Sequence, residues 1–213
     1  MKENNSNIIL IGAGGHTTSC IDVIEQENNY KIQGLVGITS DLKKSILGYS
    51  VIGTDKDLRN ILTNCSNAII TVGHIKNSEL RENLFNELLE IGYKVPSIIS
   101  PMSYVSKHAI IGDGTIVMHG AIINADAVIG NNCIINTNAL IEHGVKIGNN
   151  CHISTNSTVN GDVLIGDNCF IGSCSSIREG VRVNNKVFIA MNSLVIKDMP
   201  KNTTYIKKDV HEK

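Results

Sequence analysis

Every sixth residue through most of the second half of the chain is isoleucine or valine. The sixteen members of this series are Val105, Ile111, Val117, Ile123, Ile129, Ile135, Ile141, Ile147, Ile153, Val159, Ile165, Ile171, Ile177, Val183, Ile189 and Val195. Such fixed-period self-similarity is typical of a parallel β-helix built from hexapeptide units, each a short strand followed by a corner. Because three units close one triangular coil, residues 18 positions apart stack on one another, as Cys133 and Cys151 would. The series therefore predicts a narrow prism with an aliphatic interior.

The residues between the members of the series support this interpretation. The position four residues after every member except the last is small or β-branched, and glycine, asparagine and aspartate, which tolerate turns, fill many other positions. Cys133, Cys151 and Cys169 occupy that small position, and the chain contains no CxxC pair. We therefore interpret them as core residues rather than metal ligands or disulfide partners. Because the run has no insertion, its flat faces suit side-by-side packing of several chains.

The first half alternates apolar strands with amphipathic helices, which indicates a small parallel sheet. We expect strands at 8–11, 31–36, 49–52, 67–72 and 95–99, and helices after His16 and over 55–62 and 78–91. The boundary lies near Pro101. The chain therefore divides into a small α/β domain, residues 1–100, and a β-helix domain with a short C-terminal tail, residues 101–213.

Two glycine-containing loops are expected at the carboxyl edge of this sheet, where ligands gather in open α/β folds. The first, after the first strand, contains Gly12, Gly14, Gly15 and His16, and the second is Gly73-His74. The first resembles a Rossmann-type phosphate loop, although Thr17 stands where the third glycine of G-x-G-x-x-G would be. Phosphate binding and a plain tight turn remain equally open interpretations.

The composition excludes some classes of function. The chain has 19 Lys+Arg against 20 Asp+Glu, whereas a nucleic-acid-binding face needs an excess of positive charge. Aromatic residues make up 4% and tryptophan is absent, so base-stacking platforms are not expected. No run of apolar residues is long enough to span a membrane, and residues 1–7 lack an apolar signal region. We expect a cytoplasmic protein.

His143 and His152 are the histidines whose positions point to chemistry. Neither can enter the aliphatic interior, so both should face outward, with Glu142 beside His143 and Asn136-Thr137 one unit earlier. An imidazole titrates near pH 6.5, so it can take a proton from an attacking amine or hydroxyl at about neutral pH. A solvated surface histidine is the alternative. No third ligand stands at a recognisable spacing, so no metal site is expected.

The grouping Asn136-Thr137, Glu142-His143 and Cys151-His152-Ile153-Ser154 resembles the motif of the sialic acid O-acetyltransferase family of hexapeptide-repeat sugar acetyltransferases. That family includes bacterial N-acetyltransferases that act on nucleotide-linked amino sugars. The resemblance extends to the loop at 12–16 and to Val72-Gly73, and thus over nearly the whole chain. It implies a left-handed β-helix, direct transfer from acetyl-CoA, a homotrimer, and active sites between neighbouring prisms.

The resemblance also implies roles for single residues. It makes His143 the general base and Glu142 the carboxylate beside it, and it places His152 in the site. The loop residues Gly12, Gly14, Gly15, His16, Gly73 and His74, together with Asn136 and His152, are expected to bind the acceptor. Cofactor contacts are expected from His152, Gly161, Ala190 and Met191, where the backbone N–H of Gly161 can steady the tetrahedral oxyanion.

Departures from the family pattern affect the choice of acceptor. Gly144 stands where relatives often carry a carboxylate, and Asp41 is the nearest acidic residue after the second strand. The C-terminal pattern also differs. Lys207 and Lys208 are candidates for contacting CoA phosphates, and a solvated tail is the alternative. We predict N-acetylation of a nucleotide-linked amino-dideoxy sugar for surface-glycan synthesis, with O-acetylation of a sialic-acid-like sugar as the alternative. A catalytically inactive scaffold is a third interpretation, which the intact Glu142, His143 and His152 disfavour.

Overall fold

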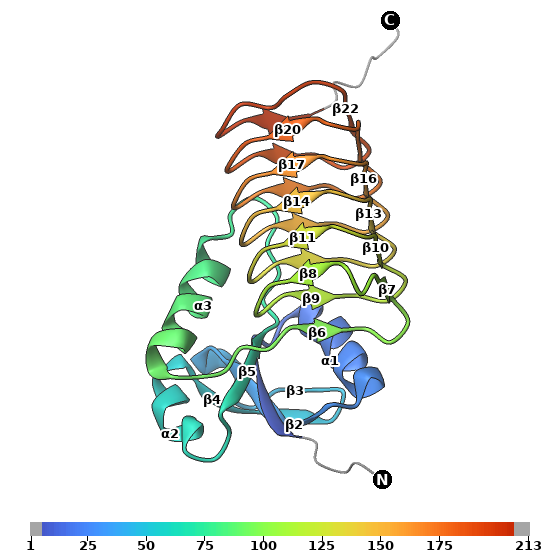
Figure 1. Cartoon of the computed structure of the whole chain (residues 1–213). Coiled ribbons are helices and arrows are strands. Elements are labelled where there is room, and N and C mark those ends of the chain that lie inside the picture. The colour runs from blue at the N-terminus through green and yellow to red at the C-terminus, as the bar shows by residue number, and fades with distance from the viewer. Residues whose placement is uncertain (1–5, 207–213) are drawn as a thin grey trace, which may run out of the picture.

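The computed structural model describes residues 6–206 and shows a small α/β unit at the base of a tall prism (Figure 1). In the α/β unit the sheet order is β3-β4-β2-β1-β5, parallel except for the β3–β4 hairpin. Its elements are β1 (Ser6–Ile11), α1 (Gly15–Glu27), β2 (Tyr30–Gly37), a 3-10 turn (Thr39–Asp41), β3 (Ser45–Ile46), β4 (Tyr49–Thr54), a 3-10 turn (Asp55–Asp57), α2 (Leu58–Leu62), β5 (Asn67–Ile70) and α3 (Glu79–Ile91).

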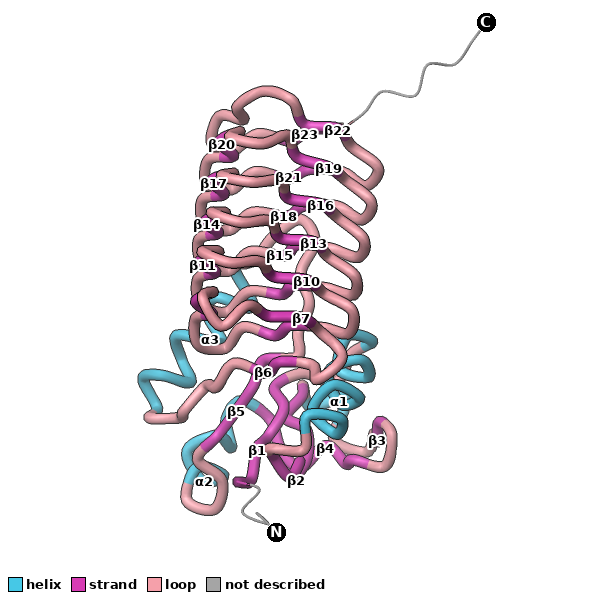
Figure 2. The backbone as a smooth tube through the Cα atoms, turned by 45° about the vertical axis from the view of Figure 1, so that its right-hand side comes forward, coloured by secondary structure: helices cyan, strands magenta, loops and turns pink. Residues whose placement is uncertain are grey.

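The prism is the left-handed parallel β-helix expected from the repeat, and its strands within residues 6–206 form three sheets (Figure 2). The first face contains β7 (Tyr104–Val105), β10 (Ile122–Ile123), β13 (Leu140–Ile141), β16 (Thr158–Val159), β19 (Ser176–Ile177) and β22 (Leu194–Val195). The second face contains β8 (Ile110–Ile111), β11 (Val128–Ile129), β14 (Lys146–Ile147), β17 (Leu164–Ile165) and β20 (Arg182–Val183). The third face contains β6 (Ile98–Ile99), β9 (Ile116–Val117), β12 (Ile134–Ile135), β15 (His152–Ile153), β18 (Phe170–Ile171), β21 (Phe188–Ile189) and β23 (Thr204–Tyr205).

The interior of the prism is the predicted aliphatic stack. All members of the Ile/Val series from Val117 to Val195 are buried, and Val105 and Ile111 pack against them partly buried. Cys133, Cys151 and Cys169 are also buried, in agreement with a structural role. Tight packing of such a narrow core explains the scarcity of aromatic residues.

Asparagine shapes one corner of each coil. Asn132, Asn150 and Asn168 adopt left-handed backbone angles, with φ of 56°, 56° and 59°, which asparagine tolerates better than most residues. Beside them, the Oδ1 atoms of Asn131 and Asn149 accept backbone N–H groups from the coil before. This ladder of side chains holds successive coils at one spacing.

One expected strand belongs to a different sheet. The segment 95–99 does not extend the α/β sheet; instead Ile98–Ile99 forms β6 and pairs with Ile116 and Val117 in the third face. The reason is register, because Ile98 stands 18 residues before Ile116 and so falls in line with the coils above it. The β-helix therefore starts before Pro101.

Arg81 joins the two units. Its side chain is 0% exposed and donates to the carbonyls of Ile70 (2.7 Å) and Val72 (2.9 Å) in the α/β unit. It also donates to the carbonyls of Gly114 (3.3 Å) and Asn132 (3.0 Å) in the β-helix. Burial lowers the pKa of Arg81 only to about 10, so the guanidinium is charged at neutral pH. A buried cation is thus held by backbone carbonyl dipoles.

Histidines near this junction are kept neutral. Burial is the main cause that lowers the pKa of His16 to about 4, of His74 to about 3 and of His152 to about 4. The positive charge of Arg81 adds to the effect in each case.

In the part of the chain that the structure describes, no helix is long and apolar enough to cross a membrane.

Replacing Arg81 by alanine should destabilise the protein strongly. The change leaves buried carbonyls on both units without donors, so we expect the free energy of unfolding to fall by at least about 3 kcal/mol. Urea unfolding followed by circular dichroism measures this loss. The matched control is Arg59→Ala, at an exposed arginine on α2, which should change stability by less than about 0.5 kcal/mol. An equal effect of both substitutions would contradict the role of Arg81.

The free energy of unfolding should fall as the pH drops from about 6.5 towards 4. In that window the unfolded chain protonates histidines that the folded chain keeps neutral, at roughly 1 kcal/mol per pH unit for each of His16, His74 and His152. Urea unfolding at neutral and mildly acidic pH measures the slope. The variant His74→Met should reduce it, whereas His108→Gln, at an exposed histidine, should not. An unchanged slope in His74→Met would refute the explanation.

Candidate active site

His143 lies exposed on the corner between β13 and β14. The backbone N–H of His143 donates to Oε2 of Glu142 (3.3 Å), so Glu142 bends back over the turn. One coil above, the N–H of Asp162 donates to the carbonyl of His143 (3.0 Å). The corner thus presents an accessible imidazole on a backbone that is fixed by bonds to the next coil.

Gly161 packs directly against the ring of His143. A Cβ on Gly161 would lie 2.7 Å from Cε1 and 3.0 Å from Nε2 of His143, so only glycine leaves room for this ring position. The carbonyl of Gly161 accepts the N–H of Gly180 (3.0 Å), whereas its own N–H donates to no group among the described residues. An imidazole and a free backbone donor therefore lie side by side, which is the arrangement expected from the 18-residue spacing.

Asp162 is a residue that the sequence analysis missed. Gly144 has φ of +68°, and a Cβ there would collide with Oδ1 of Asp162. A carboxylate from the next coil thus occupies the space over Gly144, the position at which the resemblance to the family leads one to expect a carboxylate. The 18-residue spacing between Gly144 and Asp162 is the signal that could have found it.

His152 points away from the prism interior, as expected, but it is not a surface residue. Its side chain is covered by the loop after β5, and His152 is 8% exposed. Nδ1–H donates to the carbonyl of His74 (2.7 Å), which leaves the lone pair of Nε2 to accept from Nδ2 of Asn136 (3.1 Å). The rings of Phe170 and Phe188 continue the column above it. These contacts set the tautomer of His152.

The first glycine loop leaves the N-terminus of α1 open. Gly14 precedes α1 with no side-chain cap, and no acidic residue stands in the first turn of the helix. Gly15 and Gly14 have open space where a Cβ would be. The loop is held from behind by a hydrogen bond between Thr17 and Thr71 (3.0 Å). Helix N–H groups that are free of caps favour a negatively charged group.

The two glycine loops meet at the carboxyl edge of the sheet. Gly73 lies against the side chain of His16, whose Cβ and Cγ atoms would each be 3.5 Å from a Cβ on Gly73. Gly12, with φ of +130°, packs against Thr71 and Val72 in the same way. Nε2 of His16 and both ring nitrogens of His74 are buried without hydrogen-bond partners within the described part of the chain.

Asp41 is already engaged by its own turn. Its carboxylate accepts from Nζ of Lys44 (2.6 Å) and from the N–H of Ile38 (3.2 Å). These bonds lower the pKa of Asp41, the Lys44 bond most of all. The acidic residue nearest the end of β2 is therefore a turn-stabilising residue.

The expected cofactor residues Ala190 and Met191 lie on the corner that follows the third face. Gly172, one coil below, has no room for a Cβ because the backbone of Ala190 and Met191 packs over it. Met191 is exposed. Lys207 and Lys208 lie outside the described residues.

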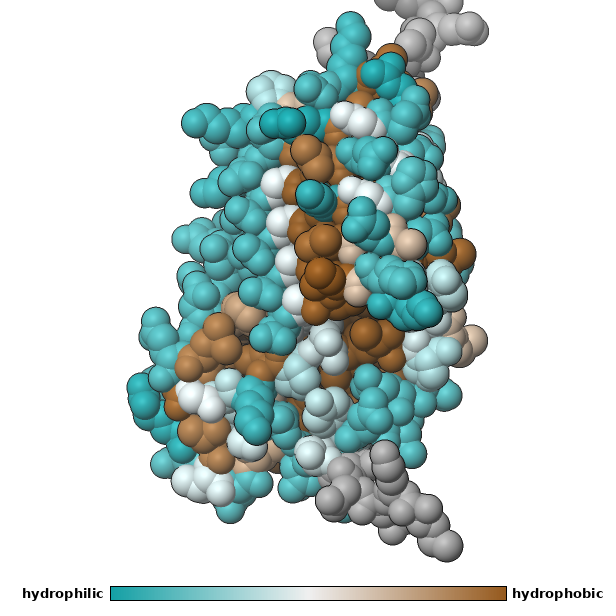
Figure 3. Space-filling view, in the orientation of Figure 1, coloured by the Kyte–Doolittle hydropathy of each residue, from teal (hydrophilic) through white to brown (hydrophobic). Residues whose placement is uncertain are grey.

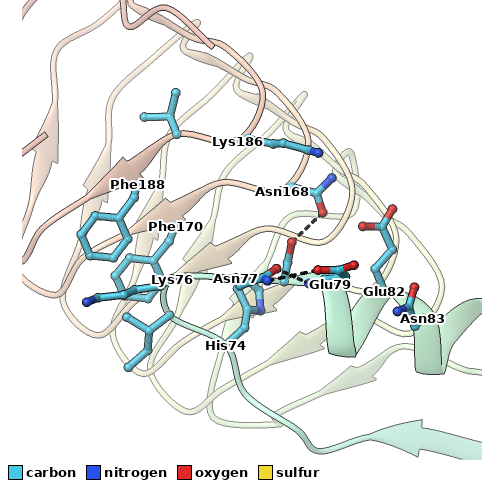
Figure 4. Close-up of a pocket in the computed structure, with 13 residues that line it drawn as sticks. His74, Lys76, Asn77, Glu79, Glu82, Asn83, Asn168, Phe170, Lys186 and Phe188 are labelled. Atoms are coloured by element: carbon cyan, nitrogen blue, oxygen red, sulfur yellow. Dashed lines mark hydrogen bonds between the residues drawn. The ribbon is translucent and has the colours of Figure 1, made fainter. Parts of the chain in front are cut away.

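A cavity of about 480 Å³ lies between the loop after β5, the first turn of α3 and the upper third face (Figure 4). His74, Asn77 and Glu79 gather on one side of it, and the rings of Phe170 and Phe188 lie on the other. Among the expected site residues that the structure describes, only His74 lines this cavity.

The predicted residues therefore form two groups on different corners of the prism. His143, Glu142 and Gly161 lie on the corner after the first face, in the segments that follow β13 and β16. Asn136 and His152 lie on the third face and its following corner, next to the two glycine loops. Among the described residues, no three His, Cys, Asp or Glu side chains come together in a way that could hold a metal ion.

Known protein families match both halves of the chain. Residues 7–88 match the PglD N-terminal domain. Residues 108–143 and 126–161 match the bacterial transferase hexapeptide family, and residues 162–197 match the hexapeptide repeat of succinyl-transferase. A search of curated proteins gives no match.

Similar solved structures span almost the whole chain. The acetyltransferase domain of PglB from Neisseria gonorrhoeae is 28% identical, with a TM-score of 0.86 over 94% of this chain and 96% of that one. PerB from Caulobacter crescentus, solved with CoA and GDP-perosamine, is 27% identical, with a TM-score of 0.86 over 93% of each chain. WeeI from Acinetobacter baumannii shares the fold at 18% identity, with a TM-score of 0.82 over 93% of this chain and 96% of that one.

The PglD-type N-terminal match, the hexapeptide matches and the similar solved structures together confirm the resemblance seen in the sequence. The chain belongs to the hexapeptide-repeat sugar acetyltransferases whose β-helix follows a PglD-type N-terminal domain, and it is an acetyl-CoA-dependent acyltransferase.

Proposed function

We propose that the protein transfers the acetyl group of acetyl-CoA to the amine of a nucleotide-linked amino-dideoxy sugar. The observation that carries this proposal is the contact between the exposed ring of His143 and Gly161, whose backbone N–H is free. A base and an oxyanion donor side by side are the minimum for acyl transfer to a neutral nucleophile. The likeness to PerB, solved with GDP-perosamine, supports the choice of an amino sugar.

His143 acts as the general base in this proposal. Its imidazole takes a proton from the acceptor amine as the amine nitrogen attacks the thioester carbonyl carbon. The C–N bond forms and the C–S bond breaks, and the proton passes on to the departing sulfur, so that an amide and a free thiol result. The N–H of Gly161 stabilises the negative charge that develops on the carbonyl oxygen.

The acceptor binds at the glycine loops. The uncapped N–H groups at Gly14 and Gly15 would take a phosphate of the nucleotide. The unpartnered nitrogens of His16 and His74 supply neutral hydrogen-bonding groups close by. Asn136 and His152 would then face the sugar from the third face.

The residues present also fit acetyl-CoA, the co-substrate that the fold family implies. Gly161 presents a free backbone N–H beside the ring of His143, and Ala190 and Met191 offer an apolar corner higher on the prism. When bound there, acetyl-CoA supplies the activated acetyl group. We propose that His152 borders this site as well, and that no metal takes part.

The separation of the two groups within one chain supports a homotrimer. His143 and the acceptor residues would meet only if the His143 corner of one prism faced the third face of another. Figure 3 shows a strip of apolar residues on the second face, which includes the exposed Ile110 and the half-exposed Val128 and Leu164. Such a strip suits packing between prisms.

Because both proposed substrates are cytoplasmic metabolites, we place the protein in the cytoplasm.

O-acetylation of a sialic-acid-like sugar is the second candidate. The observation that favours it is Asp41, whose carboxylate is engaged by Lys44 and Ile38 and so is not free to hold a nucleotide. The same base would then deprotonate a hydroxyl.

Replacing His143 by alanine should lower kcat by about 100- to 10,000-fold, because the proton of the nucleophile loses its acceptor. Thiol release from acetyl-CoA measures the rate with GDP-perosamine, a UDP-linked amino-dideoxy sugar and free sialic acid side by side. His108→Ala, at an exposed histidine on another coil, is the control and should keep full activity. Turnover of sialic acid alone would move the protein to O-acetylation. Full activity of His143→Ala would reject the mechanism.

Replacing Gly161 by alanine should lower kcat while leaving the fold stable. The new methyl group would displace the ring of His143, which is a free side-chain end, so a loss of about tenfold or more is expected. Thiol release gives kcat, and urea unfolding checks that stability is unchanged. An active enzyme with wild-type kcat would show that the contact between Gly161 and His143 has no part in catalysis.

A further inference from the structure

A serine, a histidine and an aspartate form a hydrogen-bonded line at the base of the prism, away from His143. Oγ of Ser100 lies 2.6 Å from Nδ1 of His119, and Nε2 of His119 lies 2.9 Å from Oδ2 of Asp22. Because the carboxylate can only accept, Nε2 carries the hydrogen, and Nδ1 accepts from the serine hydroxyl. The sequence analysis assigned no role to any of these residues.

This line is not a nucleophile with its base. Ser100 is 1% exposed, and its Oγ also accepts the backbone N–H of Met102 (3.0 Å). A serine nucleophile must reach a substrate carbonyl, which Ser100 cannot do from this position. The three hydrogen-bonded residues therefore have a structural role rather than a catalytic one.

The line connects three segments that are far apart in sequence. Asp22 lies on α1, the helix that begins at the first glycine loop, and Ser100 follows β6. His119 lies on the corner that follows β9. Its carbonyl accepts the N–H of Asn138 from the next coil (3.1 Å). Asn138 is two residues from Asn136, the proposed acceptor residue. The line thus ties the glycine-loop helix to the corner that carries Asn136.

Apolar packing alone would not fix the orientation of α1 on the prism. Cys20, Ile21 and Ile24 on α1 pack in one cluster with Ile116 and Met118 at the base of the prism. Such contacts are non-directional, so they hold the helix against the prism without setting its rotation or its height. Two directional hydrogen bonds at Asp22 and Ser100 supply that setting, together with the longer bond from the N–H of Ile99 to Oε1 of Glu27 (3.4 Å) at the end of α1.

We propose that His119, held between Asp22 and Ser100, is a positioning residue that sets the glycine loop over the acceptor corner. The inference rests on the proposed function in one respect, namely that this loop binds the acceptor. The positioning of the loop itself is a property of the fold and can be measured without any substrate.

The main test uses Asp22→Ala, because Asp22 is exposed and its loss leaves the core intact. Amide hydrogen exchange of residues 14–20 should become about five- to tenfold faster, as expected for the loss of one hydrogen bond. The KM for the nucleotide sugar should rise by a similar factor, while kcat and the KM for acetyl-CoA stay within twofold. Asp22→Asn should restore both values, since its amide oxygen can still accept from Nε2 of His119.

The matched control is Glu87→Ala, at an exposed carboxylate on α3, which should change none of these values. Unchanged exchange in Asp22→Ala would overturn the proposal, as would an equal rise in the KM for both substrates. If no sugar is turned over, the proposed function fails, but faster exchange in Asp22→Ala would still support the positioning role.

Discussion

Backbone pairing between successive coils is the constraint on which the rest of the molecule depends. Each strand bonds to the strand 18 residues later, so every side chain has a fixed neighbour in the coil above. A slip of one residue would turn the aliphatic series outward, so the register is strongly specified. The corners obey the same rule through asparagine at left-handed backbone angles. The contact between His143 and Gly161 is a product of this register, since both residues stand at one corner in adjacent coils.

The junction with the α/β unit determines which histidine of the candidate site is buried and which is exposed. Arg81 links the loop after β5 to the first coils through carbonyl groups only, and thereby fixes the loop that covers His152. Covered in this way, His152 is neutral and has one defined tautomer. His143 lies on a corner that nothing in the described chain covers, so it keeps the freedom that the proposed base needs. One fold thus provides a buried and an exposed histidine within ten residues of sequence.

The repeat allowed much of the fold and of the candidate site to be predicted, because residues 18 positions apart stack on one another. The buried series, the cysteine column and the pair of His143 and Gly161 all follow from the spacing of 18. The same count would have placed Ile98–Ile99 in the β-helix, but the apolar run at 95–99 also suited the α/β sheet. The carboxylate of Asp162 beside Gly144 was missed because the family pattern directs attention to the neighbour in sequence rather than to the coil above.

The sequence by itself determined the prism, its interior, its corners and the outward direction of both histidines, since a period of six leaves the chain one way to bury its aliphatic residues. Only the tertiary structure decided that His152 is covered, that Asp41 is engaged by its own turn, and that Ser100, His119 and Asp22 form one line. The reason is that these contacts join segments without a common period. Their geometry arises from the docking of the α/β unit on the prism, and no local spacing records it.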